Sequence, residues 1–85
     1  MNTRFDRRIA PRRITAIPAE ILFDGGRSRR ECIIRNLSEG GAKLEVATVI
    51  GIPNTFSLAV EGERLKHCKV AWRALKEMGV QFEGV

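Results

Sequence analysis

Residues 36–46 read NLSEGGAKLEV, and this stretch indicates the fold class of the chain. Its first half places short polar residues before two glycines, a composition typical of a tight turn. Its second half, residues 42–46, alternates apolar and polar side chains with the period of two expected of a half-buried β-strand. The stretch therefore predicts a turn between two strands.

The same pattern of short strands and turns extends over most of the chain. Turns are expected at residues 24–26 and 61–63, where glycine accepts the positive φ that hairpins need. Strands are expected at residues 15–23, 29–36, 42–46, 56–60, 67–73 and 80–83. We therefore predict an all-β fold, a small six-stranded antiparallel β-barrel, because closure removes exposed sheet edges. Residues 46–52 could instead form a brief helical turn.

The alternation also assigns side chains to the core. In residues 67–73, Cys68 and Trp72 fall on one face, and Phe56 and Phe82 occupy equivalent positions on other strands. We expect these rings to be buried. The cysteines, Cys32 and Cys68, lack Cys-x-x-Cys spacing and lie in predicted strands, which favours buried reduced thiols over a disulfide or a metal site.

Most of the excess positive charge lies at the N-terminal end. The formal net charge is +5 with a pI near 10.0, and residues 1–13 hold five arginines against Asp6 alone. The planar guanidinium can grip a phosphate or a guanine edge with two hydrogen bonds. We expect residues 1–14 to be a flexible arginine-rich arm and residues 15–85 to be the barrel. A solubilising tail is the alternative reading of the arm.

Composition excludes several classes of protein. A chain of 85 residues closes a single core, so one domain is expected. It offers one histidine, His67, on the polar face of a strand, and no tyrosine; without a nucleophile–base grouping we expect no enzyme, no metal site and no cofactor. It contains no membrane-spanning stretch and no secretory signal, so we expect a cytoplasmic protein without a membrane partner.

Two short constellations remain as candidate binding residues. Arg8 and Arg12 are separated by three residues, and the proline before Arg12 favours an extended arm. Such an arm can place one guanidinium on a phosphate and another on the O6 and N7 acceptors of a guanine. In the second constellation, Asn36 and Ser38 precede glycines that let the chain turn close to a ligand. Taken alone, this second group is equally typical of a capped hairpin.

Together these residues resemble the signature of the PilZ family, which is Arg-x-x-x-Arg in an N-terminal arm followed by Asp/Asn-x-Ser-x-x-Gly. Arg8 to Arg12 match the first motif, and Asn36 to Gly41 match the second. Residues 69–73 and 79–82 also resemble the last two strands of the family's barrel. The resemblance extends over nearly the whole chain.

The resemblance implies a barrel that binds the bacterial second messenger cyclic di-GMP. By position, Arg8 and Arg12 would bind guanine and phosphate, Asn36 and Ser38 would hydrogen-bond a guanine, and Gly41 would permit the turn. Because the family more often has an acid where this chain has Asn36, the neutral amide must read the guanine edge differently from a carboxylate.

The resemblance also bears on the rest of the arm and on signalling. Arg7 is a further candidate contact, since an arginine before the motif accompanies binding of a stacked pair of ligand molecules in this family, and Arg13 is expected to face solvent. We expect the ligand to fold the arm onto the barrel, creating a surface for an unidentified downstream protein. Hydrogen exchange in residues 1–13 that did not change at saturating ligand would contradict this.

Two alternative functions remain. One is a degenerate PilZ adaptor that binds proteins but no nucleotide, for instance as a homodimer; the intact motif residues argue against it. The other is a small basic barrel that binds single-stranded nucleic acid. Aromatic residues make up only 6% of the chain, and the expected burial of the rings leaves few to stack on bases, so no nucleic-acid partner is expected.

Overall fold

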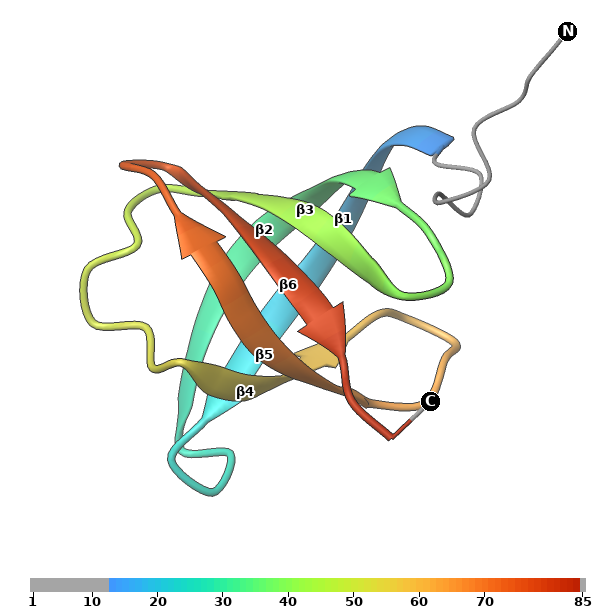
Figure 1. The fold of residues 1–85 in the computed structure, drawn as a ribbon. Helices are drawn as coiled ribbons and strands as arrows, with labels where there is room; N and C mark the ends of the chain where they lie inside the picture. The colour runs from blue at the N-terminus through green and yellow to red at the C-terminus, as the bar shows by residue number, and fades with distance from the viewer. Residues whose placement is uncertain (1–12, 85) are drawn as a thin grey trace, which may run out of the picture.

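A computed structural model describes residues 13–84, which form a closed barrel of six antiparallel strands (Figure 1). The strands are β1 (Arg13–Phe23), β2 (Ser28–Leu37), β3 (Gly41–Val46), β4 (Thr55–Ala59), β5 (Lys66–Arg73) and β6 (Glu77–Phe82). The predicted all-β barrel is thereby confirmed. The described range contains no helix, so residues 47–54 form a loop rather than a helical turn, and nothing in that range is a helix that could cross a membrane.

The strand order brings two hairpins together. Around the barrel the strands follow the order β1-β2-β3-β6-β5-β4, and β1 pairs with β4 to close the sheet. Because β3 pairs with β6, the β2–β3 hairpin lies beside the β5–β6 hairpin (Figure 1). Residues from both halves of the chain therefore share one outer surface.

Strand β1 begins earlier than the expected Thr15. Arg13 pairs with Leu37 and Ile14 pairs with Asn36, because β2 continues to Leu37 and offers β1 a partner over this length. Arg13 itself is exposed, as expected. The division between arm and barrel at residue 14 stays a prediction.

Each strand contributes one fully buried side chain to the core, as the alternation requires. These side chains are Ile21, Ile34, Leu44, Leu58, Cys68 and Met78, in strand order. Within residues 13–84 no polar or charged side chain is buried. The interior is thus an apolar core, and any binding chemistry must lie on the outside of the barrel or at its ends.

The predicted burial of both cysteines is confirmed. Burial raises the pKa of Cys32 to about 12, with smaller contributions from Cys68 and Glu20. Burial likewise raises the pKa of Cys68 to about 11, while nearby Lys66 acts in the opposite direction. Both thiols therefore stay protonated in the folded protein at neutral pH.

These raised pKa values predict a loss of stability in alkali. Above pH 9 the unfolded chain releases thiol protons that the folded chain retains, so the free energy of unfolding falls as pH rises from about 9 to 12. Between pH 8 and 10.5 each thiol should cost roughly 2 kcal/mol. Urea unfolding of wild type and Cys32→Val at both pH values measures this. Between these pH values the free energy of unfolding of Cys32→Val should fall about half as much as that of wild type. Equal losses in both proteins would contradict the prediction.

Three register shifts interrupt the regular alternation of the strands. They lie between Ile14 and Ile17 in β1, between Ile34 and Asn36 in β2, and between Val70 and Trp72 in β5. A bulge places two residues opposite one and reverses which face the following side chain occupies. Two of these shifts directly precede residues with roles predicted from the sequence. Asn36 was predicted to bind a ligand, and Trp72 was predicted to lie in the core.

The assignment of Trp72 to the core is wrong. The extra residue Ala71 in β5 turns Trp72 to the outside, where the residue is 46% exposed. Phe56 is buried as expected, and Phe82 is half-buried against the core. Trp72 is therefore an exposed ring that could stack on a base, although it was counted among the buried rings.

Candidate functional site

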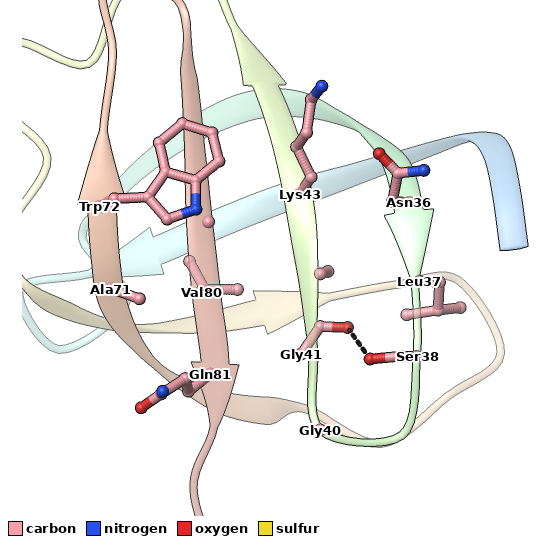
Figure 2. Close-up of a pocket in the computed structure, with 12 residues that line it drawn as sticks. Asn36, Leu37, Ser38, Gly40, Gly41, Lys43, Ala71, Trp72, Val80 and Gln81 are labelled. Atoms are coloured by element: carbon pink, nitrogen blue, oxygen red, sulfur yellow. Dashed lines mark hydrogen bonds between the residues drawn. The ribbon is translucent and has the colours of Figure 1, made fainter. Parts of the chain in front are cut away.

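An open pocket of about 280 Å³ lies on the outer surface between the β2–β3 and β5–β6 hairpins (Figure 2). Its lining residues are Asn36, Leu37, Ser38, Gly40, Gly41, Ala42, Lys43, Ala71, Trp72, Gly79, Val80 and Gln81. The structure thus brings together three of the predicted site residues, Asn36, Ser38 and Gly41. The other three, Arg7, Arg8 and Arg12, lie outside the described residues.

The turn within residues 36–41, here called the motif turn, is held by hydrogen bonds to backbone carbonyls. Both the backbone N–H and the hydroxyl of Ser38 donate to the carbonyl of Gly41, at 3.0 and 3.3 Å (Figure 2). The carbonyl of Gly40 accepts a hydrogen bond from the N–H of Phe82 at 2.9 Å. Ser38 therefore shapes the turn, as the capped-hairpin reading expects, and the turn is anchored to the end of β6.

Gly41 is required for a steric reason. A Cβ added at this position would lie 2.1 Å from the carbonyl oxygen of Val80, far inside van der Waals contact. Gly41 is absent from the glycines with positive φ in residues 13–84. The need for glycine therefore comes from the close approach of β3 to β6, rather than from the turn that the sequence suggested.

Four residues form a row across four neighbouring strands. Asn36 pairs with Lys43, Lys43 pairs with Gly79, and Gly79 pairs with Trp72, on β2, β3, β6 and β5 respectively. Directly paired residues share a face, and neighbouring strands lie 4.7–4.9 Å apart, so the row spans about 14 Å. In that order, the row presents an amide, an ammonium, a glycine without a side chain and an indole.

The indole of Trp72 lies over Gly79. A Cβ at Gly79 would meet the indole Nε1 at 2.1 Å and Cε2 at 2.6 Å, so only glycine leaves room for the ring here. The strand backbone supports one side of the indole, while Trp72 as a whole remains exposed to solvent. Such a supported and exposed ring can stack on a flat ligand.

Sequence reasoning missed Trp72, Lys43 and Gly79 as site residues. A glycine inside a strand often marks a close approach of another group. Gly79 could therefore have been recognised from the sequence as such a position. The bulge at Ala71 had no such signal, because it is defined by the pairing of β5 with β6.

The titratable side chains of the described residues can be compared with those that a metal or catalytic site would use. No group of three or more potential metal ligands occurs among residues 13–84. His67 is exposed as expected, and its Nδ1 lies 3.4 Å from the hydroxyl of Ser57. The pocket is equipped to bind a ligand through hydrogen bonds, charge and stacking.

The fold and the pocket together define a small closed β-barrel with a candidate ligand site on its outer surface. The family model of the PilZ domain matches residues 6–85, and the chain belongs to that family. PilZ domains are a family of cyclic di-GMP receptors that act as receptor or adaptor domains without catalysis. A search of the curated proteins found no match.

Proposed function

We propose that this protein is a cytoplasmic receptor that binds cyclic di-GMP at the pocket beside residues 36–41 and relays the signal to a partner protein. The observation that carries the proposal is the row from Asn36 to Trp72, which borders the family's motif turn. A receptor for a dinucleotide needs groups that read a base edge and groups that support a base face. The row contains one of each.

The chemistry of the row fits the two guanines of the ligand. The amide of Asn36 both donates and accepts hydrogen bonds, and can therefore pair with a guanine edge. The indole of Trp72 offers a stacking surface about 14 Å along the row. The two groups lie at opposite ends of the row, and we propose that they engage different bases of one ligand, or the bases of a stacked pair of ligands.

The arm supplies the remaining part of the proposed site. Arg8 and Arg12 match the family's Arg-x-x-x-Arg motif, and Arg7 directly precedes it. Guanidinium groups can pair with phosphate in a bidentate manner and can stack on a purine. We assign Arg8 and Arg12 to guanine and phosphate contacts, and Arg7 to a second ligand molecule.

Isothermal titration with cyclic di-GMP tests the proposal, with GTP and linear pGpG as controls. Arg8→Ala should weaken binding by more than ~1.5 kcal/mol, because it removes a charge-assisted hydrogen bond. A stoichiometry near two ligands per chain would support the role of Arg7. Absence of heat with wild type would favour an adaptor that binds no nucleotide, whereas wild-type affinity in Arg8→Ala would show that Arg8 does not contact the ligand.

Binding of single-stranded nucleic acid is the second candidate, because Trp72 is exposed rather than buried. Among residues 13–84 it is the one aromatic side chain that is largely exposed, whereas single-strand binders stack successive bases on several rings. This favours a compact ligand over an extended strand. Titration with short oligonucleotides at two salt concentrations distinguishes the candidates, because phosphate-dominated binding weakens steeply with salt.

A further inference from the structure

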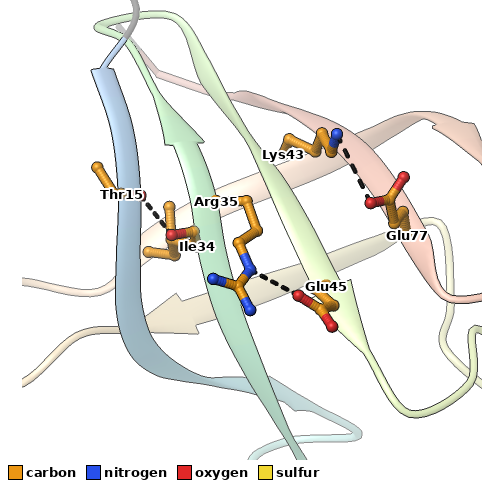
Figure 3. Close-up of polar contacts among 6 residues, drawn as sticks. All are labelled: Thr15, Ile34, Arg35, Lys43, Glu45 and Glu77. Carbon is orange, nitrogen blue, oxygen red and sulfur yellow. Dashed lines mark hydrogen bonds and ion pairs between the residues drawn. The ribbon is translucent and has the colours of Figure 1, made fainter.

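Lys43 occupies the centre of the row that borders the pocket. It lies on β3 between Asn36 and Gly79, and its side chain lines the pocket. Its Nζ is 3.6 Å from Oε2 of Glu77 on β6 (Figure 3). Among the described residues, Glu77 is the only one whose carboxylate lies within ion-pair distance of this ammonium. Glu77 does not line the pocket.

Glu77 has an electrostatic reason to hold Lys43. Glu77 is the direct cross-strand partner of Glu45, and like charges in directly opposed positions destabilise a sheet. Each carboxylate has its own cation, because Arg35 Nε lies 2.6 Å from Glu45 Oε1 (Figure 3). Removing Lys43 from this cluster would leave one arginine to balance two opposed carboxylates.

The Lys43–Glu77 pair is nevertheless suited to exchange. The two side chains are 38% and 42% exposed, and ion pairs with such exposure hold weakly because solvent screens them. Lysine carries three donors on a flexible stem, so its ammonium can reach a new acceptor at little cost. Arg35, in contrast, makes the shorter contact and does not line the pocket.

We propose that a phosphate of cyclic di-GMP replaces the carboxylate of Glu77 as the ion-pair partner of the Lys43 ammonium. Lys43 then strengthens ligand binding, and Glu77 opposes it. This inference rests on the proposed function and adds an anion-binding residue from the barrel to those of the arm. Glu77 acts through Lys43, as a competitor for its ammonium. The strength of the Lys43–Glu77 pair then sets part of the ligand affinity.

A double-mutant cycle by isothermal titration tests this inference. Lys43→Gln should weaken cyclic di-GMP binding about 10-fold, which corresponds to about 1.4 kcal/mol. Glu77→Gln should tighten binding about 2- to 5-fold, in keeping with the weakness of an exposed pair. In the Lys43→Gln background the Glu77→Gln change should have no further effect, because its target is gone.

Lys66 and Glu63 provide a matched control pair. Their Nζ and Oε1 atoms are 4.0 Å apart, their exposures of 39% and 54% are similar, and neither lines the pocket. Lys66→Gln and Glu63→Gln repeat the same charge changes outside the pocket lining and should alter affinity less than 2-fold. Urea unfolding of every variant verifies that the barrel is intact.

The outcomes separate this inference from the proposed function. If the wild type binds the ligand and Lys43→Gln and Lys66→Gln change the affinity equally, the proposed role of Lys43 is overturned. The proposed function would still stand. Equal tightening by Glu77→Gln in both backgrounds would show that Glu77 merely repels the ligand, and would overturn the competition. Absence of wild-type binding would overturn the proposed function, and this inference with it.

Discussion

Gly41→Ala is expected to destabilise the barrel by roughly 2–4 kcal/mol, from overpacking and weakened strand pairing. The added Cβ would lie 2.1 Å from the carbonyl oxygen of Val80, and a backbone atom cannot move aside as a flexible side chain can. The β3–β6 pairing must then open at its Gly41–Gln81 end. A domain of this size has a total stability of about 4–13 kcal/mol, so the loss is a large fraction.

Gly40→Ala is the matched control for this prediction. The neighbouring glycine would place its Cβ in open space, with no atom within 4 Å and without a positive φ. Alanine there should change stability by less than ~1 kcal/mol. Urea unfolding followed by circular dichroism compares the two variants. Similar stabilities would mean that β3 and β6 have room for a side chain at Gly41.

Trp72→Ala is expected to weaken cyclic di-GMP binding by about 1–3 kcal/mol, the range found for stacking of one base on an aromatic ring. The exposed indole is the stacking surface of the proposed site, and alanine removes it while leaving the core untouched. Trp72 is the only tryptophan in the chain, so its fluorescence reports directly on the site. Ligand binding to the wild-type protein should change this fluorescence.

Leu65→Ala serves as the control for Trp72. Leu65 is also an exposed apolar residue, at 53%, but lies outside this pocket, and its loss should leave affinity unchanged. Gly79→Ala gives an independent test, because its Cβ would displace the indole without removing it. Unchanged affinity in both Trp72→Ala and Gly79→Ala would show that the ligand does not contact the indole.

The proposed site owes its composition to two interruptions of the strands. The extra residue before Asn36 turns that amide outward beside Lys43, and the extra residue Ala71 turns Trp72 outward onto Gly79. β-Bulges are frequent next to functional sites because they re-aim a side chain without ending the sheet. Without them, Asn36 and Trp72 would fall on the core face with Ile34 and Val70.

The pattern of residues along the chain was sufficient to predict the barrel and part of its interior. Alternation with a period of two is a local property, and it correctly placed Phe56 and Cys68 inside. Glycine and short polar residues marked the turn at residues 38–40, because turn conformations depend on the few residues that form them. The family resemblance likewise rested on short contiguous motifs.

The tertiary structure alone decided which side chains meet at the pocket. A bulge is a mismatch between two paired strands, so the exposure of Trp72 depends on how β5 is aligned with β6. The need for glycine at position 41 depends on Val80, which only the β3–β6 pairing brings near. Lys43 and Glu77 form their ion pair through the same pairing. Local patterns carry no record of such cross-strand distances, because strand order and register are set by closure of the whole barrel.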